Sequence, residues 1–193
     1  MLDKWAHLGH KLGECWVDPT NNITYVHVPK NASSFIKGCL ISSKKWQHSD
    51  TLINSSRYLI TLRDPIERWC SGMAQYQVNS QQLELDVDNV FNQITFDDHT
   101  EQQIYFLQDI DLNKVTFVMI NDTFNETIGR WFRENGYVVN VDIMPKFNQS
   151  SDVKLELKQK YQQLVDSNPD YVLQLKKHFA ADYELINKVK FYD

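Results

Sequence analysis

The feature that most constrains the fold is a pattern in which a short apolar, β-rich run is followed by a polar loop and then an amphipathic segment. Residues 24–28 and 58–62 form two such runs, and each is followed closely by a proline. Runs of this composition predict strands, and the apolar spacing after them predicts helices. A third run covers residues 115–120. Strands that alternate with helices predict an α/β fold, with a parallel central sheet flanked by helices in three layers.

Polar residues at the expected helix starts predict where the helices begin. No repeat, low-complexity tract or Gly/Ser/Pro-rich linker interrupts the sequence, so we expect a single domain over residues 1–193. The other expected elements are helices over residues 83–94, 101–107, 151–166 and from 169 onward, and a fourth strand over residues 138–141. The expected caps are Ser33 or Ser34, Asp64 with Pro65 at the first helical position, Thr123 with Glu126 as a capping box, and Asn168.

The composition is that of an ordinary globular protein, with 42% hydrophobic and 23% charged residues. A net charge of −5 gives no support for nucleic-acid binding. No run approaches the ~18 apolar residues of a membrane span, and the N-terminal segment lacks a secretory pattern. An odd number of cysteines, and a glycosylation sequon inside a functional loop at Asn31, favour a reducing compartment. We therefore expect a soluble, cytoplasmic protein of bacterial or viral origin.

The loop over residues 29–34, Pro-Lys-Asn-Ala-Ser-Ser, has the properties of an anion site. A turn that enters a helix directs several backbone N–H groups to one point, and the helix dipole favours negative charge there. Lys30 adds a full positive charge, and Ser33 and Ser34 add hydroxyl donors. The glycine-rich Walker A pattern occurs nowhere in the chain. Alone, this loop could equally be a turn with a solvated lysine and a serine cap.

A second candidate anion site follows the run over residues 58–62. Arg63 comes directly after this expected strand, and Ser71 lies on the next helix, about 9 Å along it from Pro65. A guanidinium fork and a hydroxyl from these positions could bind one phosphate. Ligands of parallel α/β sheets bind at the carboxyl ends of the strands, where both loops are expected. Ordinary surface ion pairs of Arg63 and its neighbours are the alternative interpretation.

Together, the two segments resemble the signature of sulfotransferases that use 3′-phosphoadenosine 5′-phosphosulfate (PAPS). Residues 28–35 resemble the loop that binds the 5′-phosphosulfate, and residues 61–71 resemble the segment that binds the 3′-phosphate, with the same interval of eight residues from Arg63 to Ser71. Residues 98–103, 145–150 and 179–185 are similar to three further segments of the carbohydrate-sulfotransferase branch. The loop differs from the family in having Ala32 where glycine is usual.

The resemblance implies a P-loop-like sulfotransferase fold and transfer of a sulfuryl group from PAPS to a hydroxyl of a carbohydrate or similar small acceptor, leaving 3′,5′-phosphoadenosine (PAP). No metal is implied. Lys30 would stabilise the leaving oxygen, Ser33 and Ser34 would bind the 5′-phosphate, and Arg63 and Ser71 the 3′-phosphate. Phe35 and Trp69 are candidates for stacking on adenine or for the core. The cofactor-binding residues implied are Lys30, Asn31, Ala32, Ser33, Ser34, Phe35, Arg63 and Ser71.

A hydroxyl acceptor also requires a general base, and histidine is suited to this role near neutral pH. His99 lies in one of the family-like segments, and His48 lies between the two phosphate segments. An acidic residue such as Glu101 is the third candidate. His27 is expected to be a core residue with its hydrogen bonds satisfied.

Two other functions stay open from the sequence. The chain could bind PAPS or PAP as a regulator without catalysis, or it could be a P-loop-type kinase. The missing Walker lysine–serine step disfavours the kinase. The acceptor and the oligomeric state have no signature in the sequence.

Overall fold

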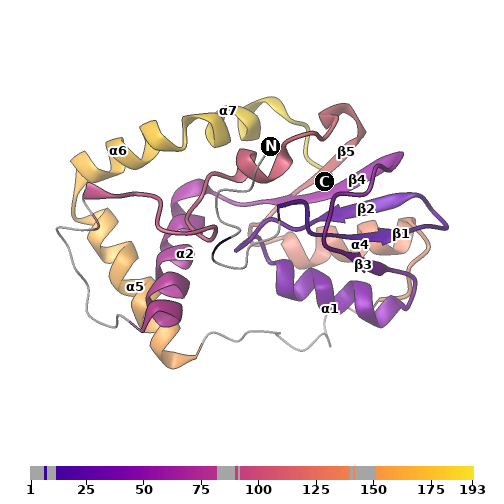
Figure 1. Ribbon diagram of the computed structural model, residues 1–193, viewed down its shortest axis with the longest axis horizontal. Helices are drawn as coiled ribbons and strands as arrows, with labels where there is room; N and C mark the ends of the chain where they lie inside the picture. Colours follow the sequence, from indigo (N-terminus) through magenta and orange to yellow (C-terminus); the bar gives the residue numbers. More distant parts are fainter. Residues whose placement is uncertain (1–6, 8–11, 82–89, 91, 140, 142–150) are drawn as a thin grey trace. The chain divides into compact units, whose positions relative to one another are not determined.

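The computed structural model describes residues 7, 12–81, 90, 92–139, 141 and 151–193 (Figure 1). The chain forms two compact units. The sheet unit is drawn from Met1–Arg63, Phe106–Gln149 and Val189–Asp193, and the helical unit from Asp64–Tyr105 and Ser150–Lys188, as far as these are described. Because both units combine separated segments, neither is a consecutive domain, and the single-domain organisation stays a prediction.

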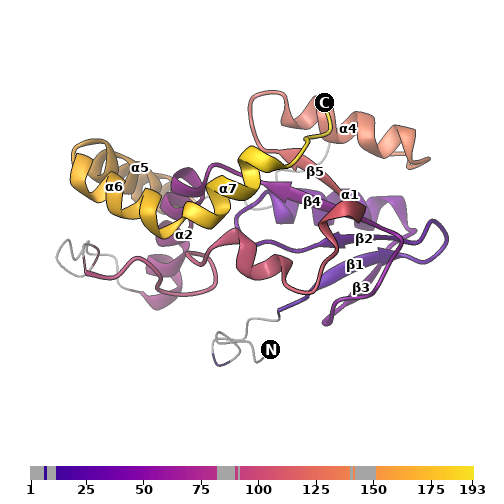
Figure 2. The same ribbon diagram turned by 90° about the horizontal axis from the view of Figure 1, so that it is seen from above.

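A five-stranded open sheet forms the centre of the sheet unit. Its strands are β1 (Cys15–Asp18), β2 (Ile23–Val26), β3 (Gln47–Ser49), β4 (Arg57–Leu62) and β5 (Val115–Met119), in the spatial order β3-β1-β2-β4-β5. β3 and β5 are therefore the two outer strands (Figure 2). The α/β class and the three predicted strands are confirmed, and β1 and β3 are additional.

The sheet is mixed, so the prediction of a parallel sheet is wrong in part. β2, β4 and β5 are parallel, whereas β1 runs antiparallel to both β2 and β3. The physical reason is the short connection between β1 and β2: Cys15 pairs with Val26, and Asp18 pairs with Ile23. A connection of a few residues can join antiparallel strands only, since parallel strands need a long crossover.

Helices α1 (Ser33–Ser43) and α4 (Phe124–Glu134) belong to the same apolar core as the strands. α1 contributes Ile36, Cys39 and Leu40 to this core, and all three are fully buried. Alternate positions of the strands supply the facing side chains, including Tyr25 and Leu59. Helices thus flank the sheet, as expected, and the complete three-layer arrangement stays a prediction.

The helical unit contains α2 (Pro65–Ser80), α5 (Asp152–Asp166), α6 (Pro169–His178) and α7 (Ala180–Lys188). Its core centres on Trp69, whose ring meets those of Tyr161 and Tyr171 edge-on, with centroids 5.7 Å away in both cases. The Trp69 indole N–H donates to the carbonyl of Ile94. Trp69 is therefore a core residue of this unit, which confirms one of its two interpretations.

The caps show where local sequence signals hold. Asp64, Ser151 and Asn168 cap α2, α5 and α6 through their side chains, with Pro65 at the start of α2. The capping box at Thr123 and Glu126 is wrong: the Thr123 hydroxyl donates to Asn121 instead of capping α4.

Two other expected elements differ from the structure. Residues 101–107 form only a short 3-10 helix, η2 (Gln103–Leu107), and a second, η3 (Leu112–Lys114), precedes β5. Val138 and Val139 do not extend a strand. Most of the expected helix over residues 83–94, the family-like segment over residues 145–150, and Asn140 lie outside the described residues.

Two general findings concern the described part of the chain. None of its helices combines the length and apolar character needed to cross a membrane. The three cysteines, Cys15, Cys39 and Cys70, are buried thiols that form no disulfide.

Candidate functional site

The loop after β2 begins with a tight turn. The N–H of Asn31 donates to the carbonyl of Val28 at 3.3 Å, so Pro29 and Lys30 are the central residues of the turn. Proline suits the first central position because its φ is fixed, and the second requires a positive φ in a type II turn. Lys30 has a φ of 66°. The sequence thus places a lysine where glycine is the usual residue.

Asn31 fastens this loop to the neighbouring parallel strand. Its side-chain amide donates to the carbonyl of Thr61 at 2.7 Å, and the Thr61 hydroxyl donates to the Asn31 carbonyl at 2.7 Å. Both residues are fully buried. Because β4 continues from Thr61 through Leu62 to Arg63, this reciprocal pair ties the Lys30 loop to the end of the strand that leads to Arg63.

The start of α1 has features that favour an anion. The N-cap is Ala32, with a φ of 54°, and its methyl side chain makes no capping hydrogen bond. The prediction that Ser33 or Ser34 is the cap is therefore wrong: both lie in the first helical turn. N–H groups of a first turn have no acceptor within their own helix and favour an anion.

The start of α2 has the opposite character. The Asp64 carboxylate accepts from the N–H groups of Ile66 and Glu67 at 3.0 and 2.9 Å. Glu67 adds another negative charge in the first turn. The first-turn N–H groups of α2 are therefore poor donors to an anion, so the phosphate expected near this helix depends on the side chains of Arg63 and Ser71.

The left-handed backbone of Ala32 gives a stability prediction. In this region, steric strain of the Cβ costs an L-residue about 1 kcal/mol or more, and glycine has no such strain. Replacing Ala32 with glycine should raise the free energy of unfolding by up to about 1 kcal/mol, measured by urea denaturation. The matched Ala74→Gly change within α2 should lower it by about the same amount or more. A lower stability of Ala32→Gly would contradict this assignment of strain.

Phe35 and Ser71 occupy different kinds of position. The Phe35 ring packs on Phe124, with centroids 6.0 Å apart, so Phe35 contributes to the core beside the loop. Stacking of Phe35 on adenine stays a prediction.

Ser71 is half-buried on α2 and belongs to the helical unit, whereas Arg63 belongs to the sheet unit. Their joint binding of one phosphate also stays a prediction.

A group of charged residues that was not expected from the sequence surrounds Glu14 in the sheet unit. The Glu14 carboxylate lies 2.8 Å from His27 Nδ1, 2.7 Å from Lys37 Nζ and 3.3 Å from His48 Nε2. His27 precedes the Lys30 loop by two residues, and Lys37 lies one helical turn after Ser33. Glu14 therefore connects both flanks of the loop to His48 on β3.

The charges around Glu14 keep it ionised. Burial alone would raise the pKa of Glu14, but hydrogen bonds and charges of His27 and Lys37 lower it well below its ordinary value. His27 is thus hydrogen-bonded, as predicted, but the prediction of a core residue is wrong, because His27 is only partly buried and follows the end of β2. His48 is held by Glu14 and lies edge-on to Trp16, with centroids 5.4 Å apart and 42% of its side chain exposed.

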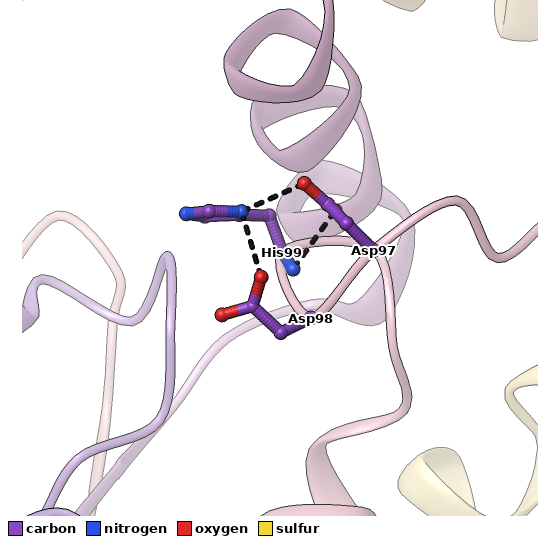
Figure 3. A group of neighbouring side chains, drawn as sticks. All are labelled: Asp97, Asp98 and His99. Atoms are coloured by element: carbon purple, nitrogen blue, oxygen red, sulfur yellow. Dashed lines mark hydrogen bonds and ion pairs between the residues drawn. The ribbon is translucent and has the colours of Figure 1, made fainter. Parts of the chain in front are cut away.

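The other base candidate, His99, is held by two carboxylates in the helical unit (Figure 3). Its Nδ1 lies 2.9 Å from Asp97 Oδ2 and 3.1 Å from Asp98 Oδ1. The second ring nitrogen, Nε2, points away from both carboxylates (Figure 3). A carboxylate on Nδ1 fixes the tautomer and leaves Nε2 to accept a proton, as in catalytic His–Asp pairs.

The surroundings of His99 also shift its affinity for a proton. Burial lowers the pKa of His99, but the hydrogen bonds and charges of Asp97 and Asp98 outweigh it and raise the pKa above 6.5. The side chain keeps 25% exposure. The ligand atoms of all three residues lie within 4.8 Å of one another, so the same group could also hold a metal ion.

Glu101 is less suited to act as the base. It is 3% exposed, and its carboxylate accepts from the N–H of Gln102 at 2.9 Å. Its carbonyl accepts from the buried Arg68. Glu101 is therefore built into the loop that presents His99.

Sequence reasoning missed Glu14 and Asp97. Glu14 is far in sequence from two of its three partners, and Asp97 lies just outside the family-like segment. A His preceded by two acidic residues is a local signal that could have identified Asp97.

Comparison of the chain with models of known families, with curated proteins and with solved structures finds no match.

Proposed function

We propose that this protein is a PAPS-dependent sulfotransferase that acts on a hydroxyl of a carbohydrate or similar small acceptor. The observation that carries the proposal is the loop between β2 and α1. It combines a lysine in a tight turn, the start of a helix whose N-cap is an alanine, and a buried Asn31–Thr61 pair that holds the shape of the loop. Such a loop suits the 5′-phosphosulfate end of a nucleotide.

The chemistry requires positioning and neutralisation of charge. The acceptor oxygen attacks sulfur in line with the leaving oxygen of the 5′-phosphate. The new S–O bond forms as the bond to that phosphate oxygen breaks, and negative charge accumulates on PAP. Lys30 and the first-turn N–H groups of α1 stabilise this charge, and the hydroxyl proton passes to the base. We assign the base to His99, with His48 as the alternative, and the 3′-phosphate to Arg63 and Ser71.

The held histidines favour an enzyme over a regulatory nucleotide-binding module. A binder has no need of an imidazole oriented by carboxylates, whereas general-base catalysis does. Both His99 and His48 meet this description, with Asp97 and Asp98 or with Glu14 as partners.

Calorimetric titration with PAP, ADP and ATP, without and with Mg²⁺, tests the nucleotide assignment. We expect PAP to bind at least tenfold more tightly than ADP, without any requirement for Mg²⁺. Tighter binding of ATP with Mg²⁺ would instead favour the kinase. Transfer of ³⁵S-sulfate from PAPS to a panel of glycans then separates an enzyme from a binder: tight PAP binding without transfer to any glycan would favour the regulatory module.

A further inference from the structure

The segment that presents His99 lies against α2 at Gly72. A Cβ at position 72 would be 2.3 Å from the carbonyl oxygen of His99 and 2.8 Å from its carbonyl carbon. It would also lie 3.2 Å from Thr100 Cγ2. The first two are backbone atoms, which cannot rotate away as a flexible side chain can. The close approach of the loop to the helix therefore requires glycine at this position.

Arg68, one helical turn before Gly72, fastens the same segment from the same side of α2. Its guanidinium donates to the carbonyl of Glu101 and, at 3.4 Å, to that of Asp98. Arg68 is fully buried, and burial lowers its pKa to about 10 although the charges of Asp182 and Glu101 oppose that change. It therefore remains a cation at neutral pH.

Two further contacts fix the segment on either side of His99. The Thr100 hydroxyl oxygen accepts from the N–H groups of Phe96 and Asp97 at 2.8 and 3.1 Å. Asp182 of α7 accepts from the N–H groups of Gln103 and Ile104 at 2.8 and 2.9 Å. The polar backbone around His99 is thus held from within the loop and from α7, and Gly72 and Arg68 set its distance from α2.

We propose that Gly72 is a positioning residue for His99, because it lets the backbone of His99 seat directly on α2, next to Ser71. The catalytic part of this inference rests on the proposed function, in which His99 is the base. Any side chain at position 72 moves the His99 backbone outward and changes the setting of its imidazole between Asp97 and Asp98. A displacement of about 1 Å is enough to lower the rate of a positioned reaction substantially.

The test is the Gly72→Ala variant, with Gly129→Ala of α4 as the matched control. A Cβ at Gly129 would meet only side-chain atoms, the nearest being Val141 Cγ2 at 3.1 Å. Two readouts are compared: kcat and KM for sulfuryl transfer, and the imidazole ¹⁵N resonances of His99, titrated with pH by NMR and assigned with His99→Gln.

We expect Gly72→Ala to lower kcat by about 10–100-fold, with the Kd for PAP within threefold of the original. In Gly72→Ala the His99 resonances should shift and their titration should move to lower pH. In Gly129→Ala both the resonances and kcat should stay as in the original protein. Unchanged His99 resonances would overturn the proposal, whether or not kcat falls. Shifted resonances in a protein without any transferase activity would uphold the positioning role and refute the proposed function.

Gly72→Ala replaces glycine within a helix and could prevent folding, so Arg68→Lys provides a second variant. Lysine keeps the positive charge but lacks the fork that reaches two carbonyls. If the variant is folded by circular dichroism, the same shift of the His99 resonances is expected, and its absence would overturn the proposed fastening.

Discussion

Replacing Lys30 with alanine should lower the turnover of sulfuryl transfer by about 10²–10³-fold, the usual cost of removing one donor to a developing negative charge. Lys30 sits in the second central position of its turn, with a φ of 66°. The loop is anchored one residue later by Asn31. The backbone of Lys30 is therefore fixed two residues before the N-cap of α1, and its charge is proposed to act on the leaving oxygen there.

The measurement is kcat with saturating PAPS and acceptor, together with the Kd for PAP. Lys44→Ala is the control, because Lys44 is an exposed lysine at the other end of α1. That variant should keep its turnover. A Lys30→Ala enzyme with turnover within about threefold of the original would refute the role of Lys30, even if nucleotide binding were weakened.

Replacing His99 with alanine should lower kcat by about 10²–10⁴-fold, the range expected for loss of a general base. The base must be unprotonated to act, so activity should rise with pH through the pKa of His99. Because Asp97 and Asp98 raise that pKa, the increase in activity with pH should be centred above pH 6.5. The isosteric Asp98→Asn change removes one charge and should move the rise to lower pH.

His48→Ala provides the matching experiment in the sheet unit. If His99 is the base, the His48 variant should keep the pH dependence of the original enzyme. If His48→Ala abolishes the pH-dependent rise and His99→Ala leaves it intact, the assignment is reversed. In that case Glu14 takes the place of Asp97 and Asp98 as the carboxylate that orients the base.

The sequence predicted those elements that have strong local signals. The strands that begin at Ile23 and Arg57 are rich in apolar and β-branched residues, and the caps at Asp64 and Asn168 require only neighbouring N–H groups. β1 (Cys-Trp-Val-Asp) and β3 (Gln-His-Ser) are short and do not form a β-rich run like that over residues 24–28. Their presence and direction depend on pairing with β2, which is a tertiary property, so the mixed sheet could not be predicted.

The candidate site shows the same division. The turn and helix start over residues 29–34 were predictable from the order of residues, but the cap at Ala32 was not, because alanine has no intrinsic preference for the left-handed region. The role of Gly72 could not be predicted from the neighbouring sequence. Glycine is required at position 72 because the backbone of His99, 27 residues later in the chain, lies where a Cβ would be.

The discontinuity of the two units has a consequence for how the chain is made. The N–H of Tyr192 donates to the carbonyl of Phe117 at 2.8 Å, and the ring of Tyr192 lies under the guanidinium of Arg130, 5.4 Å from its centroid. These contacts cover the outer edge of β5, which could otherwise pair with a strand of another molecule. During translation, β5 leaves the ribosome more than 70 residues before Tyr192 does. The nascent sheet therefore carries an uncovered edge until the last segment emerges.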